Sequence, residues 1–363
     1  MKAAVLLETN SPLVIESVDV EKPREQEVQI RITATGICHS DLHNIKGEWD
    51  NQVPVILGHE GAGIVEAVGD GVYHVEPGDN VILSFRANCG RCGNCVRGIP
   101  ALCNGHNSPR QLMHDGSARV SLQGRPLFVS ARLGTWAEQV VCPAEQVIPI
   151  KGDIPPEVAA LIGCCVTTGV GSVINIPATR AGMTVAVFGC GGVGLSVIQG
   201  ARLLNASKII AVDIFDHKLE FAYKFGATDV VNSREVDPVE AIKELTGGGA
   251  DMAFDSFGSA QTVNSSVMAL RKAGTAVMIG LGPVGDTAPI DMVDFLRNQK
   301  SLLSSYYGAA SPHETFDKLI DFYLKGLLDV ESLITRTYPL ERINEGFDAL
   351  ARGEDGRGIV VFS

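Results

Sequence analysis

The stretch "TVAVFGCGGVGLSVIQGARLLNASKIIAVD", residues 184–213, decides the fold of the second half of the chain. An apolar run leads into the pattern G-x-G-x-x-G, a helical pattern follows, and a second apolar run ends in Asp213. Glycines at this spacing allow a tight turn, close approach of backbone N–H groups to a pyrophosphate, and close packing of helix on strand. The stretch therefore predicts a strand–helix–strand unit that binds a dinucleotide. Its glycines are Gly189, Gly191 and Gly194.

The residues around this unit extend the prediction. A carboxylate at Asp213, the end of the second run, accepts from adenosine ribose hydroxyls and repels a 2′-phosphate, which favours NAD over NADP. Further apolar runs alternate with helical patterns at 238–245 and 260–274. Together with the first two strands they give six candidate parallel strands, which predicts a complete doubly wound sheet. The further runs are Asp229–Val231, Met252–Asp255, Thr275–Leu281 and Ser301–Ser305.

The first 150 residues have a different pattern. Short β-branched runs such as 28–38 and 62–72 are separated by Gly and Pro, which predicts a mostly β domain. The β-like run 358–362 at the C-terminus is expected to pack back on this domain. A chain of 363 residues is long for a single core. We therefore expect one domain of residues 1–165 and 309–363 and a second of residues 166–308.

Composition excludes several classes of partner. The net charge is −12, which argues against binding to nucleic acid or to anionic membrane surfaces. The N-terminus shows neither the apolar core nor the small-residue cleavage site of a signal peptide, so we expect a cytoplasmic protein. Nine cysteines in such a chain indicate metal binding or catalysis more than disulfides.

Four of the cysteines lie in "NCGRCGNCVRGIPALC", residues 88–103, with the spacing C-x2-C-x2-C-x7-C. Four thiolates around Zn²⁺ leave no vacant position, so such a site is structural. A loop of free thiols and an iron–sulfur cluster are the alternatives. The cysteines are Cys89, Cys92, Cys95 and Cys103.

Three other segments carry metal-competent side chains: "GICHSDLH" (36–43), "LGHEGAG" (57–63) and "LIGCCVTTGVG" (161–171). Each alone has a plain interpretation, because a buried Cys is usually inert and a lone His is usually a satisfied polar residue. Together they supply the two thiolates and one imidazole of an open catalytic zinc site. The fourth position of such a zinc takes water or an alcohol and lowers the pKa of that group.

These motifs, in this order and spacing, resemble the zinc-dependent medium-chain dehydrogenases, and specifically the NAD-dependent alcohol dehydrogenases of that superfamily. The resemblance also rests on "GHEGAGIVEAVG", "FGCGGVGL", "GATDVVN" and "INEGFDAL", and it covers essentially the whole chain. It implies an α/β protein in which a GroES-like, mostly β catalytic domain is joined to a doubly wound parallel Rossmann domain that binds NAD.

The resemblance also implies two zinc ions per chain. Cys38, His59 and Cys164 match the catalytic ligands, whereas Cys165 stands where relatives commonly carry a small residue. Asp41 matches the carboxylate that orients the ligand His, and Glu60 matches an acid that can approach the metal. The residues that match the structural zinc ligands are Cys89, Cys92, Cys95 and Cys103.

Further roles follow from the same resemblance. Ser40 matches the hydroxyl that takes the alcohol proton, and His43 matches the far end of that relay. His39 stands where many relatives place an arginine on the coenzyme phosphate, and Arg357 matches a C-terminal arginine that reaches the pyrophosphate. The remaining residues that match coenzyme contacts are Thr168, Gly189, Gly191, Gly192, Val193, Gly194, Asp213 and Lys218.

The expected activity is reversible hydride transfer between an alcohol and NAD. We expect Trp49, Phe85 and Leu133 to line the substrate pocket, which suggests primary alcohols that are apolar or aromatic. The alternatives are a glutathione-adduct formaldehyde dehydrogenase, a polyol dehydrogenase, an alcohol:acceptor oxidoreductase that retains its coenzyme, and a non-catalytic zinc- and nucleotide-binding relative. A homodimer paired near Ser301–Ser305 is expected, with a homotetramer as the alternative.

Overall fold

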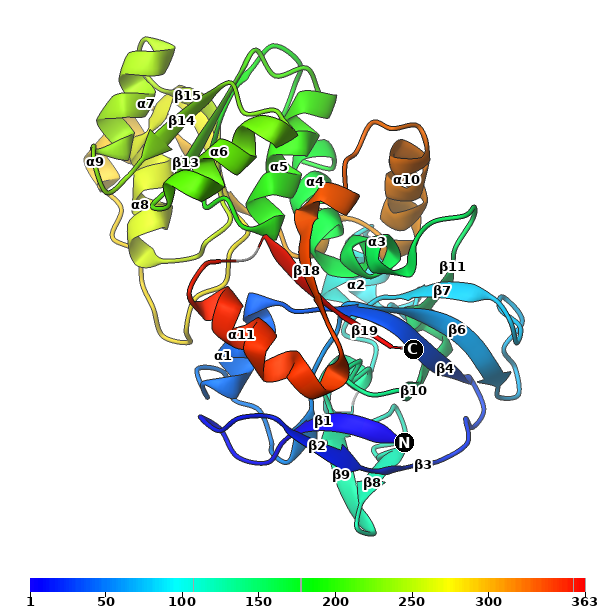
Figure 1. The fold of residues 1–363 in the computed structure, drawn as a ribbon. Coiled ribbons are helices and arrows are strands. Elements are labelled where there is room, and N and C mark those ends of the chain that lie inside the picture. Colours follow the sequence, from blue (N-terminus) through cyan, green and yellow to red (C-terminus); the bar gives the residue numbers. More distant parts are fainter. Residues whose placement is uncertain (107, 177, 355, 363) are drawn as a thin grey trace. The chain divides into compact units, whose positions relative to one another are not determined.

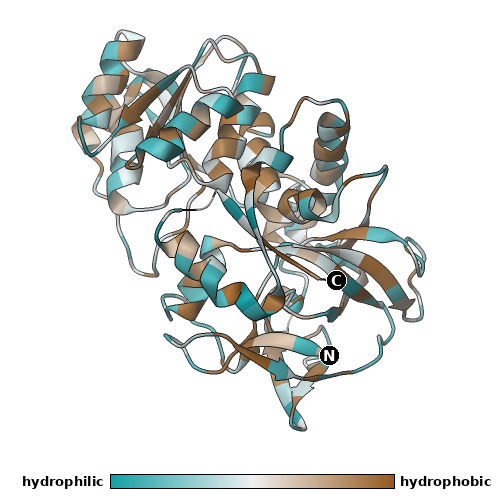
Figure 2. Ribbon diagram, in the orientation of Figure 1, coloured by the Kyte–Doolittle hydropathy of each residue, from teal (hydrophilic) through white to brown (hydrophobic). Residues whose placement is uncertain are grey.

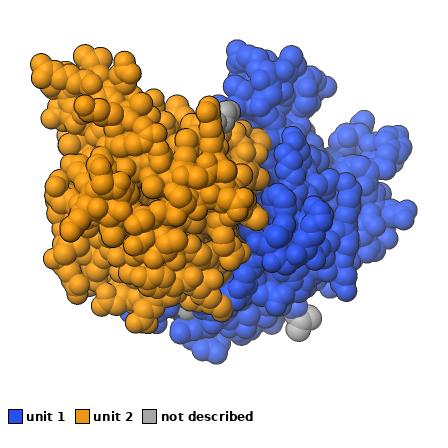
Figure 3. All heavy atoms as spheres, turned by 90° about the horizontal axis from the view of Figure 1, so that it is seen from above, with its two compact units in different colours: residues 1–164, 311–363 blue, residues 165–310 orange. Residues whose placement is uncertain are grey.

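The computed structural model describes residues 1–106, 108–176, 178–354 and 356–362. The chain divides into two compact units, coloured separately in Figure 3. Unit 1 comprises Met1–Cys164 and Ser311–Ser363, and unit 2 comprises Cys165–Ala310. The sequence placed these boundaries after residues 165 and 308, close to the positions in the structure.

Unit 2 is built on a six-stranded sheet with the order β14-β13-β12-β15-β16-β17, and every pair in it is parallel. This order reverses direction between β12 and β15, as in a doubly wound nucleotide-binding sheet, so the predicted fold class is confirmed. Ligands bind such sheets outside the carboxyl ends of the strands at this switch point. The strands are β12 (Thr184–Phe188), β13 (Lys208–Asp213), β14 (Asp229–Asn232), β15 (Ala250–Asp255), β16 (Leu270–Met278) and β17 (Ser301–Ser304).

Helices of unit 2 alternate with these strands along the chain (Figure 1). Figure 2 shows the strands of the sheet largely in the hydrophobic colours and the surrounding helices in mixed colours, as expected for a sheet covered on both faces. The helices are α4 (Thr167–Ile174), α5 (Gly192–Leu203), α6 (Asp216–Phe225), α7 (Pro238–Thr246), α8 (Ala260–Met268) and α9 (Met292–Arg297).

A helix and the strand after it differ most from their expected bounds, and the strand expected over Thr275–Leu281 is β16, Leu270–Met278. The helix expected over 260–274 ends at Met268, because Leu270 already pairs with Ala250 of β15. The ladder then shifts register before it resumes at Thr275, and Ala273 within the shift has a φ of 57°. Strand pairing with β15 thus overrides the local helical preference of this segment.

Unit 1 contains two sheets with the orders β11-β7-β6-β4-β19-β18 and β2-β1-β5-β9-β8-β3, and β10 pairs with β4 beside the first. The strands are β1 (Lys2–Leu6), β2 (Val14–Ser17), β3 (Asp19–Val20), β4 (Glu27–Gly36), β5 (Val55–Ile56), β6 (Gly61–Val68), β7 (Asn80–Leu83), β8 (Val120–Leu122), β9 (Arg125–Val129), β10 (Gln139–Pro143), β11 (Val147–Pro149), β18 (Ile334–Tyr338) and β19 (Arg357–Val361). The helices are α1 (His39–Ile45), α2 (Gly93–Val96), α3 (Pro156–Leu161), α10 (Pro312–Leu324) and α11 (Ile343–Ala351).

The C-terminal strand ties the ends of unit 1 together. β19 runs antiparallel to β4, with Ile359 opposite Gly36, and parallel to β18. Its red arrow lies beside the blue β4 in Figure 1. The expectation that the C-terminus packs back on the first domain is therefore confirmed. Nearby, the Trp136 ring packs edge-on against Phe347 of α11, with the centroids 4.9 Å apart.

One helical stretch, Pro156–Ile174, has the length and apolar composition needed to cross a membrane. Within the described part of the chain, 83% of its most apolar window is buried inside the protein, as expected for a helix that packs in a core.

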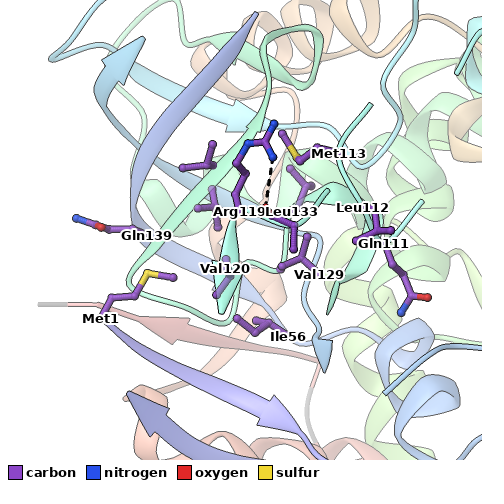
Figure 4. A pocket seen from close by; sticks show the side chains of 14 residues that line it. Met1, Ile56, Gln111, Leu112, Met113, Arg119, Val120, Val129, Leu133 and Gln139 are labelled. Carbon is purple, nitrogen blue, oxygen red and sulfur yellow. Dashed lines mark hydrogen bonds between the residues drawn. The ribbon is translucent and has the colours of Figure 1, made fainter. Parts of the chain in front are cut away.

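A buried ion pair anchors the long polar segment 104–135 to the first sheet. The Arg119 guanidinium donates to both carboxylate oxygens of Glu27, over 2.5 and 2.8 Å, and both residues are more than nine-tenths buried. Arg119 also donates to Asp115 over 2.7 Å. It lines a small, mostly apolar cavity with Leu133 and Val129 (Figure 4). Removing one partner of a buried pair leaves an uncompensated charge.

We therefore predict that Arg119→Ala lowers the free energy of unfolding by roughly 3–5 kcal/mol, because Glu27 is left buried without its cation. Arg24→Ala is the matched control: Arg24 is half exposed and pairs with the same Asp115, so its loss should cost at most about 1 kcal/mol. Urea denaturation of the two variants beside wild type is the measurement. Equal costs for the two variants would contradict the assigned role of the buried pair.

Candidate metal and coenzyme sites

The expected catalytic zinc ligands come together in unit 1. Cys38 immediately precedes α1, His59 lies in the turn before β6, and Cys164 lies in the π-helical turn Ile162–Val166. One ligand atom from each of these residues and one from Glu60 all lie within 4.8 Å of one another, and all four residues are buried. Single π-helical turns are frequent at functional sites. Cys165, the alternative thiol, is fully buried and does not belong to the group.

The spacing of these donors suits a tetrahedral ion. His59 Nε2 lies 3.5 Å from Cys164 Sγ. A tetrahedral zinc with Zn–S and Zn–N bonds of about 2.3 and 2.0–2.1 Å separates the two donor atoms by about 3.6 Å. Three protein donors from two thiols and one imidazole leave one position open, as catalytic zinc sites do.

Asp41 fixes the orientation of the imidazole. Its carboxylate is fully buried and lies 3.2–3.3 Å from His59 Nδ1, and it also accepts from the backbone N–H of Gly58 over 3.2 Å. An Nδ1–H bound to a carboxylate leaves the Nε2 lone pair for a metal. Because Nε2 is also the atom that faces Cys164, the structure places Asp41 where an orienting carboxylate is needed.

The pKa shifts at this site show that its buried anionic groups require a positive charge among them. A hydrogen bond with Cys164 holds the pKa of Cys38 well below its usual value, although burial opposes this. Burial disfavours a charged His59, but the charge and hydrogen bond of Asp41 raise the pKa of this imidazole well above its usual value. Burial raises the pKa of Asp41, against the attraction of His59. The shifts therefore hold a thiolate and a carboxylate around the cationic His59, and a divalent cation bound among the donors of Cys38, His59 and Cys164 would supply the same positive charge.

Glu60 pairs with Arg357. The Arg357 guanidinium donates to Glu60 Oε2, and both side chains are buried. Burial raises the pKa of Glu60 to about 7, and the Arg357 charge opposes this. Within the described residues Glu60 Oε1 is buried without a hydrogen bond, so one carboxylate oxygen remains for a cation. Gly36 is required here, because a Cβ would collide with the Glu60 carboxylate.

The Glu60–Arg357 pair was not expected from the sequence, which gave Arg357 only a coenzyme role. The two residues are 297 positions apart, and no local pattern links them. The pairing of β19 with β4 provides the physical reason, because it brings Arg357 to the same end of the sheet as Gly36 and the turn before β6.

The other four cysteines form a separate group around the short helix α2. Their sulfurs lie within 4.8 Å of one another, and Cys92 Sγ lies 3.5 Å from Cys95 Sγ and 3.8 Å from Cys103 Sγ. Four thiolates on a tetrahedral zinc with bonds of about 2.3 Å have S···S separations of about 3.8 Å. Backbone N–H groups of Cys89 and Cys92 donate to sulfurs of the same group over 3.3 Å. All nine cysteines of the chain are free thiols.

The pKa values of these cysteines show that ionisation of one thiol makes ionisation of its neighbour less favourable. Backbone hydrogen bonds at Cys95 and Asn104 lower the pKa of Cys92 to about 6. Burial and then the neighbouring Cys92 raise the pKa of Cys95 to about 12. Thiols this close cannot all ionise without a cation between them. The group therefore fits a closed structural zinc site that offers no place for substrate.

The glycine loop of unit 2 fits a dinucleotide. Gly189 has a φ of 90°, and a Cβ at Gly194 would lie 1.8 Å from the Gly189 carbonyl oxygen, so both glycines are needed by the fold. A Cβ at Gly191 would meet no protein atom within 4 Å. Gly191 precedes α5, and no side chain among the described residues caps its first turn. The free N–H groups of Gly192, Val193 and Gly194 and the open surface beside Gly191 suit a pyrophosphate.

Asp213 ends β13 as expected, and it has a second role that the sequence did not reveal. Its carboxylate accepts from the backbone N–H groups of Cys190 over 2.7 Å, Ile214 over 2.7 Å and Phe215 over 3.1 Å. It thereby holds the glycine loop to the end of the second strand. Lys218 lies on α6 with its Nζ 5.3 Å from the centre of the Phe215 ring, and Thr168 lies on α4.

The two residues expected to form a proton relay share α1, but the described residues show no hydrogen bond between Ser40 and His43. His43 Nδ1 contacts the Glu48 carboxylate instead, and its ring stacks on Trp49 with centroids 5.0 Å apart. His39 is exposed at the start of the same helix. Glu48 is thus a partner of His43 that the sequence did not indicate.

Of the residues expected to line the substrate pocket, Phe85 contacts one of the candidate metal ligands. Its ring meets the His59 ring edge-on, with centroids 5.4 Å apart. Trp49 lies against His43. Leu133 is buried in a core of unit 1 and lines the cavity of Figure 4, which none of the candidate zinc ligands lines.

Comparison with known families agrees with this geometry. Residues 24–152 match the alcohol dehydrogenase GroES-like domain, and residues 192–325 match the zinc-binding dehydrogenase domain. The chain belongs to the zinc-dependent medium-chain dehydrogenase family.

Individual members of this family resemble the chain over its full length. It is 36% identical to alcohol dehydrogenase 1 of Pisum sativum, over 99% of this chain and 96% of the relative. Benzyl alcohol dehydrogenase of Acinetobacter calcoaceticus superposes with a TM-score of 0.94 at 31% identity, over 100% of this chain and 99% of that one. A zinc-binding dehydrogenase of Sinorhizobium meliloti 1021 bound to NADP superposes with a TM-score of 0.82 at 27% identity, over 99% of each chain.

The neighbouring thiols at the π-helical turn give a matched pair for metal analysis. We predict that Cys164→Ala leaves about one zinc per chain, whereas Cys165→Ala keeps about two, because only the Cys164 sulfur lies among the donors. Metal content of the purified variants by mass spectrometry is the measurement. Loss of zinc from Cys165→Ala with retention in Cys164→Ala would reverse the assignment.

The glycine loop gives a second matched pair. Gly191→Ala should leave the free energy of unfolding within about 0.5 kcal/mol of wild type, because its Cβ meets no protein atom, yet weaken coenzyme binding tenfold or more. Gly194→Ala should cost about 1–3 kcal/mol of stability, because helix and strand must separate. Fluorescence titration with NADH and urea denaturation measure the two effects. Wild-type coenzyme affinity in Gly191→Ala would place the pyrophosphate elsewhere.

Proposed function

We propose that this protein catalyses the reversible oxidation of an alcohol to an aldehyde or ketone with NAD, using one catalytic and one structural zinc per chain. One observation carries the proposal: the buried donors of Cys38, His59 and Cys164 converge with an orienting carboxylate behind the imidazole. This donor set leaves one position for substrate, whereas the four-cysteine group leaves none.

When bound, zinc supplies a Lewis acid that lowers the pKa of an alcohol and polarises a carbonyl, and NAD accepts the hydride. The chain's own groups prepare that step. Asp41 holds His59 in one tautomer, and Glu60 balances the charge of Arg357 beside the donors. Ser40 takes the alcohol proton as it releases its own hydroxyl proton toward the outer end of the relay, where His43 with Glu48 delivers a proton to solvent.

Aromatic side chains support a primary alcohol with an apolar or aromatic group as substrate. Phe85 packs against the ligand imidazole, and Trp49 packs against His43. Flat apolar surfaces of this kind stack favourably on an aromatic ring. The similarity to a benzyl alcohol dehydrogenase points to the same class.

NAD is the proposed coenzyme because of Asp213. Its carboxylate lies at the end of β13, where the adenosine ribose is held in this fold, and it repels a 2′-phosphate. The relative bound to NADP shows that this fold also accepts the phosphorylated coenzyme, so the choice in this chain rests on the Asp213 charge.

We also propose a cytoplasmic homodimer. Among the residues that the structure describes, the edge strand β17 pairs only with β16, and exposed apolar side chains lie on it and on the helix before it. Exposed apolar patches of this kind mark interaction surfaces. The residues are Met292, Val293, Leu296 and Leu303.

Initial rates with NAD and with NADP, over short-chain, long-chain, benzylic and polyol alcohols and glutathione-adduct formaldehyde, test the proposal. The expected result is turnover with NAD that is fastest for benzylic or long-chain primary alcohols. A preference for polyols or for the glutathione adduct would show that the proposed substrate class is wrong. A preference for NADP would overturn the role assigned to Asp213. Absence of turnover in zinc-replete protein that binds NAD would indicate a non-catalytic relative.

The relay yields its own prediction. Ser40→Ala should lower kcat by about 10²–10⁴-fold, because it removes the first proton acceptor. His43→Ala should cost less and regain activity with added imidazole, because a small base can act at the outer end. Glu48→Gln keeps the shape of the His43 partner and should fall between wild type and His43→Ala. Small equal effects for Ser40→Ala and His43→Ala, without rescue by imidazole, would contradict the relay.

A further inference from the structure

A third group of metal-competent side chains lies in unit 1, outside both sites described above. One ligand atom from each of His106, His114 and Glu145 lies within 4.8 Å of the others. The histidines belong to the polar segment 104–135, and Glu145 lies in the 3₁₀ turn Ala144–Gln146 between β10 and β11. The group thus joins two parts of unit 1 that are distant in sequence.

The donor atoms converge. The two imidazole rings stack almost in parallel, with centroids 3.7 Å apart and an angle of 8° between their planes. Each ring directs Nε2 toward the same Glu145 oxygen, at 2.7 Å from His114 and 3.3 Å from His106. Within the described chain, the buried His106 Nε2 makes no hydrogen bond. A buried polar atom without a partner is costly, and a cation among the three donors would satisfy it.

The surroundings of the group favour the protonation states that bind a metal ion, which are a neutral imidazole at His106 and a carboxylate at Glu145. Burial, then the neighbouring His114, lowers the pKa of His106, which keeps this imidazole neutral as a metal ligand must be. Burial disfavours the Glu145 carboxylate, but the hydrogen bond from His114 outweighs this and lowers its pKa. Two nearby cations, Arg132 and Arg91, also lower the pKa of His106. The charges of these arginines repel a divalent cation and therefore limit the affinity of the site for it.

We propose that His106, His114 and Glu145 form a third divalent-metal site, for a borderline cation such as Zn²⁺. Zn²⁺ accepts both imidazole nitrogen and carboxylate oxygen donors, whereas Ca²⁺ and Mg²⁺ prefer sites made of oxygen donors alone. The side chains of His114 and Glu145 are 32% and 26% exposed, so water completes the coordination. The bound ion cross-links the segment 104–135 to the β10–β11 turn and stabilises unit 1 by mass action.

Zinc titration of protein that already holds its two resident zinc ions tests this site. Equilibrium dialysis against Zn²⁺ should show one further equivalent, bound at least tenfold more weakly than the resident ions because of the arginines. A rise in melting temperature should accompany it. His114→Gln and Glu145→Gln should each abolish both effects. His217→Ala, which removes an exposed histidine of unit 2, is the matched control and should retain both.

Circular dichroism and retention of the two resident zinc ions show that each variant is folded, so loss of the third equivalent reports on the site. The proposal is overturned if wild type takes up no further zinc, or if the third equivalent persists in His114→Gln and Glu145→Gln. It is also overturned if the third equivalent disappears from His217→Ala alone.

Discussion

The hydrogen bond between the buried Asp41 carboxylate and His59 is the interaction on which the candidate active site depends. It joins α1 to the turn before β6, 18 residues further along the chain, and the Gly58 N–H strengthens the same junction. A carboxylate with no exposed surface is stable only if such partners compensate its lost hydration. Because Nδ1 is occupied by this hydrogen bond, the ring can use only Nε2 to bind a metal ion, and Nε2 lies beside Cys164 Sγ.

Charge balance separates the two candidate zinc sites into different kinds of chemistry. Four thiolates form a closed set with a net charge of about −2 around zinc and leave no position for substrate. Two thiolates and a neutral imidazole form an open and formally neutral set. The open set lies beside the buried Glu60–Arg357 pair, whose charges compensate each other. In the proposed function, substrate chemistry therefore belongs to the set that Asp41 orients, and the four-cysteine group belongs to the framework.

Local patterns predicted much of the fold and the residue types of both metal groups. The six strands of unit 2 were predictable because buried parallel strands are continuous apolar runs between helical segments. The helix expected over 260–274 was wrong beyond Met268, because pairing of Leu270 with Ala250 is a tertiary effect. The pairs Glu60–Arg357 and His43–Glu48 and the contacts of Asp213 with its loop could not be predicted, because they arise from folding rather than spacing.

The zinc affinity of wild type and of Asp41→Asn, measured by competition with a chelator, tests the central claim most directly. Asparagine keeps the shape of Asp41 but removes the charge that holds the His59 Nδ1–H. The account predicts that one zinc per chain binds about 10–100-fold more weakly, while the zinc of the four-cysteine group is unchanged. Equal affinity of both zinc ions in wild type and variant would contradict the claim that Asp41 orients a metal-binding His59.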